Sequence, residues 1–252
     1  MQQPIFSIIT ITYNAEQWLE RTILNVLSQS YPNIEYIVID GASTDSTIDI
    51  IKQYESGIAC WISEPDKGIY DSMNKGLQKA TGDYVWFVNA GDTLFTSDTI
   101  QQVVSLIAKK SVLPDIIYGE TMIVDEDGQS LGNRRLKAPA KLTWKSFRLG
   151  MLVCHQSFIT KRTIAPLYNL IYHYSADFDW CIRCMKRAKR IYNTRIILAN
   201  FLSGGVSTTQ HKASLKERYN IMCHYYGLVP TTILHIWFAI RFCFAKWIKG
   251  EI

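Results

Sequence analysis

Two patterns of apolar residues alternate along the first 110 positions. Short β-branched and aromatic runs between polar turn residues have the length of strands buried on both faces. These runs are 5–11, 35–39, 58–62 and 84–88. The intervening segments are predicted helices, most clearly 16–30, where Trp18, Leu19, Ile23, Val26 and Leu27 form one apolar stripe. The other predicted helices are 46–54, 69–79 and 97–110. This alternation predicts right-handed βαβ units and an α/β protein with a mainly parallel sheet.

Polar residues gather where the predicted strands end. Parallel strands end at one edge of their sheet, and ligands bind at that edge in open α/β folds. The candidates are Tyr13, Asn14, Asp40, Asp45, Glu64, Asp66, Asn89 and Asp92. Neighbouring carboxylates repel one another unless a cation or hydrogen-bond donors are present. A divalent metal with a phosphorylated ligand would supply that charge. Asp92 could instead cap the helix that follows it.

The second half of the chain is less regular. A strand is predicted at 115–120, then a hairpin around the turn at 125–128, and another strand at 152–158 with His155 in its middle. A helix is predicted over 180–190, preceded by Asp177 and Asp179. Two questions stay open. His155 is either hydrogen-bonded structure or part of a site. The two aspartates either complement the helix dipole or include a general base near the acidic edge.

Charge divides the chain into two parts. Residues 1–133 contain 7 Lys or Arg and 18 Asp or Glu, a net charge of −11, whereas residues 134–252 contain 20 and 4, a net charge of +16. Such a division suggests two faces with different partners. The basic part suits nucleic acid, an anionic membrane or a phosphorylated acceptor. A nucleic-acid binder would leave the acidic edge unexplained, so nucleic acid is not expected as a partner.

Several classes are disfavoured by what the chain lacks. There is no G-x-G-x-x-G after the first strand, no Walker-type phosphate loop and no G-x-S-x-G, which disfavours dinucleotide binding, a P-loop triphosphatase and an α/β-hydrolase. The six cysteines show no disulfide spacing, and Cys181 and Cys184 form one C-x-x-C without a second pair. Two thiols on a helix are favoured there over a zinc or redox site. The N-terminus does not resemble a signal peptide, which predicts a cytoplasmic protein.

Taken together, four blocks resemble the family 2 glycosyltransferases of the GT-A fold, especially bacterial transferases of capsule, exopolysaccharide and O-antigen assembly. The blocks are 7–14, 40–47, 81–92 and 175–179, and the similarity covers roughly residues 5–205. The resemblance implies a Rossmann-like, mainly parallel sheet with flanking helices, to which the tail adds C-terminal amphipathic helices. The implied domains are a GT-A domain at 1–205, with a nucleotide-sugar half at 1–133 and an acceptor half at 134–205, and a helical extension at 206–252.

The resemblance also implies roles for individual residues. Tyr13 and Thr12 would pack at the base of the donor, Asp40 would accept a hydrogen bond from the base or ribose, and Asp177 would be the catalytic base. The remaining predicted donor contacts are Asn14, Asp66, Asp71 and Asn89, and the predicted acceptor-side residues are His155 and Asp179. The segment Asn89 to Asp92 falls where the family carries its D-x-D motif. Asn89 and Gly91 replace its carboxylates, which leaves Asp92 as the predicted metal ligand. Ala176 stands where an acidic residue often precedes the base.

These roles predict an inverting glycosyltransferase, with inversion implied by the resemblance alone. It would move a sugar from a nucleotide-sugar, expected to be UDP-linked, to a hydroxyl of a lipid-linked or saccharide acceptor. Mg²⁺ or Mn²⁺ would stabilise the charge growing on the leaving diphosphate. The alternative is a non-catalytic nucleotide- or sugar-binding protein with a decayed metal motif, for which Asn89 and Gly91 are the best evidence.

The C-terminal tail suggests contact with a membrane. Residues 229–247 are largely apolar but are interrupted by Arg241 and Lys246. A spanning helix needs about 20 apolar residues and disfavours a central Arg, whereas an interfacial helix tolerates one. We therefore predict peripheral contact with the anionic inner face of the cytoplasmic membrane. The alternative is a helix that packs on the enzyme's own core.

Overall fold

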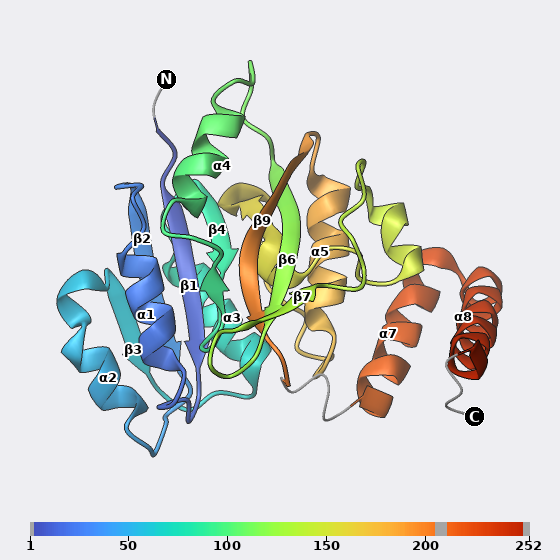
Figure 1. The fold of residues 1–252 in the computed structure, drawn as a ribbon, viewed down its shortest axis with the longest axis horizontal. Coiled ribbons are helices and arrows are strands. Elements are labelled where there is room, and N and C mark those ends of the chain that lie inside the picture. The colour runs from blue at the N-terminus through green and yellow to red at the C-terminus, as the bar shows by residue number, and fades with distance from the viewer. Residues whose placement is uncertain (1–2, 205–210, 249–252) are drawn as a thin grey trace.

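The computed structural model describes residues 3–204 and 211–248, which form a twisted sheet covered by helices on both faces (Figure 1). The first four long strands are parallel and lie side by side in the order β3-β2-β1-β4. They are β1 (Phe6–Thr12), β2 (Ile34–Asp40), β3 (Cys60–Ser63) and β4 (Tyr84–Phe87). Their carboxyl ends therefore lie along one edge, as the sequence predicts.

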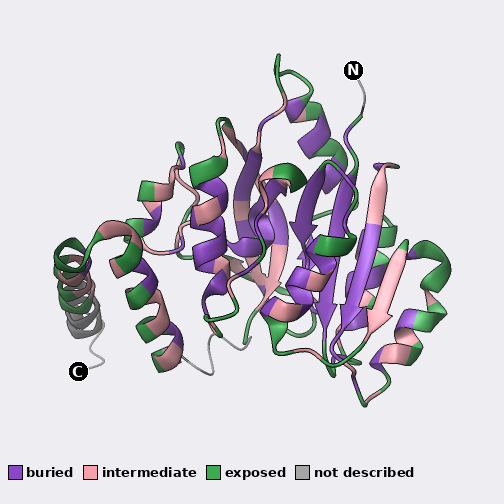
Figure 2. Ribbon diagram, turned by 180° about the vertical axis from the view of Figure 1, so that it is seen from behind, coloured by how far each residue is buried: buried purple, intermediate pink, exposed green. Residues whose placement is uncertain are grey.

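The predicted helices between these strands are confirmed. They are α1 (Leu19–Leu27), α2 (Thr47–Gln53), α3 (Ile69–Lys79) and α4 (Thr99–Ile107). Side chains from α1 and α4 join one hydrophobic cluster with β1 and β4, whereas α3 packs into a second cluster on the opposite face. The central strands are consequently buried on both faces (Figure 2). This double burial explains why the strands are continuous apolar runs rather than alternating ones.

The sheet continues beyond β4 with mixed directions. The order is β4-β8-β6-β9-β5, and β7 pairs with β6 in the predicted hairpin. These strands are β5 (Thr93–Leu94), β6 (Ile116–Val124), β7 (Ser130–Asn133), β8 (Phe158–Lys161) and β9 (Ile191–Leu202). The long strand β9 was not predicted, because its apolar run is interrupted by Asn193-Thr194-Arg195. Arg195 has a φ of 59°, at an irregularity where the pairing of β9 with β6 shifts.

The predicted strand at 152–158 is wrong. His155–Ser157 form a short 3₁₀ helix, η3, and the strand β8 begins only at Phe158. The three residues of η3 are all buried, and they contact different neighbours: His155 meets Tyr168, the Gln156 carbonyl accepts from Trp86, and Ser157 bonds Thr121. A strand would send alternate side chains to opposite faces. The other short 3₁₀ helices are η1 (Glu55–Gly57), η2 (Trp144–Leu149) and η4 (Arg162–Ile164).

Helix α5 (Ala176–Arg187) begins earlier than the predicted start at residue 180. Asp177 and Asp179 therefore lie in its first turn rather than before it. After β9 come α7 (His211–Tyr226) and α8 (Leu228–Ile248), at the opposite end of the molecule from α2 (Figure 1). The predicted boundary between residues 205 and 206 lies outside the described residues. Within the described ranges, no helix is both long and apolar enough to cross a bilayer.

Candidate active site

The loop after β2 is organised by the buried carboxylate of Asp40. Its Oδ2 accepts hydrogen bonds from the Ser43 backbone N–H at 2.9 Å and from Ser63 Oγ at 2.7 Å, and the Ser43 hydroxyl donates to Oδ1. Asp40 has no exposed surface. The structure therefore places Asp40 at the predicted edge, where it holds the loop at 41–45 against the end of β3.

Gly41 allows Tyr13 and Asp66 to approach each other. A Cβ atom on Gly41 would lie 2.6 Å from Asp66 Oδ2 and 3.3 Å from Tyr13 Cδ2, so a side chain would force them apart. Asp66 is itself held by the Gly68 backbone N–H at 2.8 Å and by the Ser72 hydroxyl. The Tyr13 ring is 62% exposed. A free aromatic face beside a fixed carboxylate can pack on a planar base while the carboxylate accepts from a hydroxyl.

Asn14 joins the first two loops of this edge. Its side-chain oxygen accepts from the Thr44 backbone N–H at 2.9 Å, and its own N–H donates to Ser43 Oγ at 2.8 Å. Asn14 and Ala42 both have positive φ angles, 45° and 62°. Non-glycine residues in this region are strained, and such strain gathers at functional sites. The side chain of Asn14 thus braces the loops.

Asp71 braces the turn that follows Asp66. It accepts from the Lys67 backbone N–H at 3.1 Å and lies 3.9 Å from the Lys75 ammonium, which also pairs with Glu64 at 3.0 Å. Asp71 therefore holds the start of α3 rather than standing alone at the edge.

Two buried oxygens at the ends of β1 and β4 have no hydrogen-bond partner among the described residues. They are Thr12 Oγ1 and Asn89 Oδ1. The two strands are neighbours, and the loop after β4 is tied to β1 by the Ala90 N–H donating to the Ile11 carbonyl at 3.1 Å. Unpaired buried polar atoms are costly and call for an explanation. Here they are what a polar ligand at this edge would satisfy.

Asp92 lies beneath the edge, which disfavours the prediction of a metal ligand. Its Oδ1 accepts from the Leu202 backbone N–H at 3.0 Å and its Oδ2 from Gln156 Nε2 at 2.9 Å, and only 4% of the residue is exposed. Burial raises its pKa to about 7. The helix-capping alternative is wrong, because these partners belong to β9 and η3 and α4 has no side-chain cap. Gly91 has a φ of 94°, and a Cβ there would meet Leu202 at 2.6 Å, so the close approach of β9 excludes an aspartate without rearrangement.

Asp177 is the carboxylate that the structure leaves partly open. The hydroxyl of Tyr70 donates to its Oδ1 at 3.2 Å, and the Phe178 backbone N–H donates to the same oxygen at 2.9 Å. No described residue donates to Oδ2. Tyr70 comes from α3, directly after the turn that carries Asp66. The structure thus links Asp177 to the predicted donor side through Tyr70, and Oδ2 is the oxygen without a hydrogen-bond donor among the described residues.

His155 and Asp179 are buried and engaged by other side chains, which disfavours their prediction as acceptor-side residues. His155 Nε2 lies 2.6 Å from the Tyr168 hydroxyl, and its ring packs on Phe87 and Trp180. Burial lowers its pKa to about 4. Asp179 is also buried: its Oδ2 pairs with Arg183 Nε at 2.7 Å, and its Oδ1 accepts from Tyr225 Oη at 2.7 Å. Both residues have structural roles.

Glu217 was missed by sequence reasoning. Its carboxylate accepts hydrogen bonds from three consecutive backbone N–H groups, those of His173, Tyr174 and Ser175, at 2.6–2.8 Å. These residues immediately precede α5, so Glu217 on α7 fixes the start of the helix that carries Asp177. In the sequence it is marked only as an isolated acid among basic residues, and a contact across more than 40 positions leaves no local signal.

No protein-only metal site is seen in the described ranges. They contain no group of three or more His, Cys, Asp or Glu residues placed to hold an ion. Cys181 and Cys184 are thiols on a helix, α5, as predicted, but they are fully buried rather than half-buried, and burial raises the pKa of Cys181. At the open edge, Asn89 Oδ1 is a hard oxygen without a partner, and Mg²⁺ commonly takes only one or two protein ligands when phosphates supply others.

Residues 7–165 match the sequence model of the family described as glycosyl transferase family 2. The chain belongs to this family. It is 31% identical over 218 residues to an uncharacterized glycosyltransferase of Mycobacterium tuberculosis, covering 84% of this chain and 80% of the relative. It is 26% identical over 220 residues to a putative teichuronic acid biosynthesis glycosyltransferase, TuaG, of Bacillus subtilis, covering 85% and 86% of the two chains.

Solved structures confirm the GT-A fold of this family 2 glycosyltransferase. A 1–349 fragment of S. aureus TarS with UDP-GlcNAc has a TM-score of 0.68 at 19% identity; the match spans 86% of this chain and 64% of that one. A mannosyltransferase from Pyrobaculum calidifontis with GDP-Man and Mn²⁺ has a TM-score of 0.62 at 16% identity, spanning 93% and 74%. At these identities the likeness establishes the fold alone.

Proposed function

We propose that this glycosyltransferase transfers a sugar, with inversion, from a nucleotide-sugar to a hydroxyl acceptor, with Asp177 as the base. The observation that carries the proposal is the position of Asp177, whose Oδ2 has no hydrogen-bond donor among the described residues. Its other oxygen accepts from Tyr70, at the start of α3, which follows the turn that carries Asp66. Asp66 in turn meets Tyr13 at Gly41. A base and a donor cradle on one edge are what direct displacement at an anomeric carbon requires.

The donor is proposed to be UDP-linked. Tyr13 packs on the base, with Thr12 in the same pocket, Asp66 accepts from a hydroxyl of the nucleotide, and Asn89 offers its unpaired oxygen on the side of the diphosphate. Asp40, Asn14 and Asp71 act by holding the loops. The nucleotide is supported by the UDP-GlcNAc and UDP complexes of TarS, while the GDP-Man complex shows that the same fold accepts another base.

A Mg²⁺ or Mn²⁺ ion fits this edge as a companion of the donor diphosphate. Asn89 is the residue proposed to contact it, because its side-chain oxygen is buried without a partner. When bound, such an ion would stabilise negative charge on the leaving diphosphate. The chain's own residues orient the donor and receive the proton: the acceptor hydroxyl loses it to Oδ2 of Asp177, while Tyr70 and the Phe178 N–H hold the other oxygen of that carboxylate.

The proposed acceptor is a lipid-linked or saccharide intermediate of a cell-surface polysaccharide or glycolipid. The support comes from relatives whose names refer to teichuronic acid and to PGL/p-HBAD biosynthesis. Peripheral contact with the inner face of the cytoplasmic membrane is part of this proposal. It is supported by the net charge of +16 in residues 134–252 and by the exposed apolar side chains of α8.

The test compares Asp177→Asn with Asp98→Asn, an exposed aspartate outside the edge. Thermal shifts with UDP, GDP, CMP and TDP, each with and without Mn²⁺, identify the nucleotide, and turnover of the matching donor is then measured. Asp177→Asn should lose roughly 10²-fold or more in turnover while keeping the nucleotide shift, and Asp98→Asn should keep both. Full turnover in Asp177→Asn would reject Asp177 as the base. The absence of any nucleotide shift in the parent would favour the decayed binding protein.

A further inference from the structure

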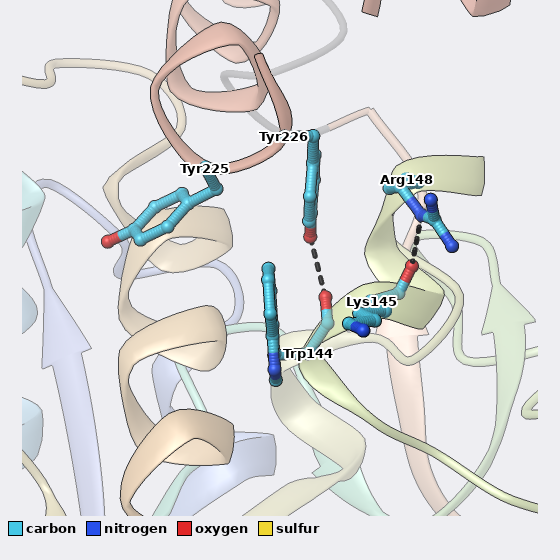
Figure 3. A pocket seen from close by; sticks show the side chains of 5 residues that line it. All are labelled: Trp144, Lys145, Arg148, Tyr225 and Tyr226. Atoms are coloured by element: carbon cyan, nitrogen blue, oxygen red, sulfur yellow. Dashed lines mark hydrogen bonds between the residues drawn. The ribbon is translucent and has the colours of Figure 1, made fainter. Parts of the chain in front are cut away.

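A small pocket lies at the α8 end of the molecule, between η2 and the end of α7 (Figure 3). It has a volume of about 200 Å³ and is lined by Trp144, Lys145, Arg148, Tyr225 and Tyr226. None of these residues belongs to the candidate active site. The proposed reaction leaves the pocket unexplained.

The aromatic wall of the pocket is fixed by its own contacts. The rings of Trp144 and Tyr226 are stacked, with centroids 5.7 Å apart and planes at 8°. The Tyr226 hydroxyl also donates a hydrogen bond to the backbone carbonyl of Trp144 at 2.6 Å (Figure 3). Both the ring stacking and this hydrogen bond therefore connect α7 to η2. A ligand would therefore enter a site that is already formed, with little ordering required on binding.

Among the described residues, the cations in and near the pocket form no ion pair, and the neighbouring carboxylate of Asp179, which accepts from the Tyr225 hydroxyl, pairs with Arg183. Lys186 Nζ lies 5.4 Å from the Trp144 ring and 5.3 Å from the Tyr225 ring, and Lys145 Nζ lies 5.7 Å from Trp144. The ion pairs found among the described residues include none of Lys145, Arg148 and Lys186. The sequence has no Asp or Glu at 128–176 or at 218–250. The pocket is consequently suited to an anion.

Exposed apolar residues follow the lining residues directly or closely in the sequence, and α8 contacts η2. Leu149 is 51% exposed, Leu228 is 63% exposed and Val229 is 67% exposed. The same exposed character continues along α8 in Ile233, Ile236, Trp237 and Ile240. The side of α8 that faces α7 is instead partly polar: Thr231 is buried, Thr232 bonds the Tyr219 hydroxyl, and His235 packs on Tyr219. A helix whose exposed side is apolar is typical of helices that lie in the interface of a membrane or pack against a partner.

We propose that the pocket binds the phosphate of an anionic membrane phospholipid while the apolar side of α8 lies in the interface of the bilayer. Lys145 and Arg148 supply the positive charge, and Trp144, Tyr225 and Tyr226 stand at headgroup depth, where aromatic residues with a polar atom are favoured. The inference deepens the proposed membrane contact and rests on it. The proposed membrane contact rests on the net positive charge of residues 134–252, and this inference adds one defined binding site for the lipid phosphate.

The test is sedimentation of the full chain with phosphatidylcholine vesicles, with and without phosphatidylglycerol. Lys145→Gln/Arg148→Gln is compared with Lys52→Gln/Lys109→Gln, which removes the same charge from exposed positions on α2 and just after α4. The pocket variant should bind phosphatidylglycerol vesicles about 10-fold or more weakly, and the control variant less than about 2-fold. Both should keep the thermal shift with UDP, which shows that they are folded. Lys145→Arg/Arg148→Lys keeps both charges and should bind like the parent.

The outcomes separate the pocket from the membrane contact itself. Equal losses in the pocket and control variants would overturn the headgroup site and leave only diffuse electrostatic attraction. Equal binding to both vesicle types, unchanged in the pocket variant, would also overturn it and would indicate apolar docking by α8 alone. Failure of the parent to bind either vesicle would instead reject the proposed membrane contact.

Discussion

The carboxylate of Asp92 shows how a residue can be located from a sequence while its hydrogen-bond partners cannot. Its place after β4 was predicted, and so was the adjoining D-x-D position. What the sequence could not show is that β9, more than 100 positions later, would bring the Leu202 N–H to its carboxylate. The same holds for His155 and Asp179, whose partners Tyr168 and Tyr225 come from other segments. Asp177 was predicted as the base from the resemblance; the structure places it in the first turn of α5, and its role stays a prediction.

The raised pKa of Asp92 leads to a stability prediction with a defined sign. Burial raises its pKa from 3.8 to about 7 in the folded state, so the folded protein holds this proton more tightly than the unfolded chain. The resulting stabilisation is complete below about pH 4 and is lost progressively as the pH rises to about 7. Asp92→Asn should flatten this part of the curve of unfolding free energy against pH. Urea unfolding between pH 4 and pH 8 measures it.

Two further measurements on Asp92 separate a structural from a metal role. Asp92→Ala leaves Leu202 N–H and Gln156 without their acceptor and should cost about 1–3 kcal/mol of stability. Asp92→Asn should retain Mn²⁺-dependent nucleotide binding. Loss of that binding in a normally stable Asp92→Asn protein would instead restore Asp92 as a metal ligand.

At the scale of elements, the parallel half of the sheet was predictable and the mixed half was not. Strands β1, β2 and β4 are largely buried and rich in apolar residues, and the edge strand β3 is half-buried, so all four stand out in the sequence as short, mainly apolar runs. Strand β9 carries Asn193-Thr194-Arg195 at an irregular pairing, and η3 buries three adjacent side chains in different directions, so neither follows a simple period. The open edge lies at the ends of the parallel strands β1 to β4, so its position was predicted better than the positions of β9 and η3.

Helix α7 is predicted to position the base through Glu217. Glu217→Ala removes the acceptor of three N–H groups before α5, so we expect about 1.5–3 kcal/mol less stability and a lower turnover with unchanged nucleotide affinity. Lys216→Ala, on the exposed side of the same helix, is the matched control and should change neither. The measurement is donor turnover beside the dissociation constant of UDP. Parent-like turnover in Glu217→Ala would exclude a positioning role.

At the scale of the whole molecule, the charge division coincides with a division of surfaces. The acidic edge lies at the ends of β1 to β4. The pocket with Lys145 and Arg148 lies between η2 and α7, and α8, with its exposed apolar residues, lies beside α7 at the opposite end of the molecule from α2 (Figure 1). Composition alone left nucleic acid, membrane and phosphorylated acceptor open for the basic half. The placement of apolar side chains around its cations adds the observation that favours a membrane.

This arrangement predicts different salt responses for the two surfaces. Attraction of exposed cations to an anionic bilayer acts over a Debye length, which shrinks from about 30 Å at 0.01 M salt to about 8 Å at physiological ionic strength. Vesicle binding should therefore fall steeply with added NaCl. Donor binding should change little, because the contacts proposed for it, with Tyr13, Asp66 and Asn89, are short-range, and the Asn89 oxygen is buried. Sedimentation with phosphatidylglycerol vesicles and UDP titration over one salt series measure both. Salt-insensitive vesicle binding would show that the apolar side of α8, rather than the basic half, supplies the attachment.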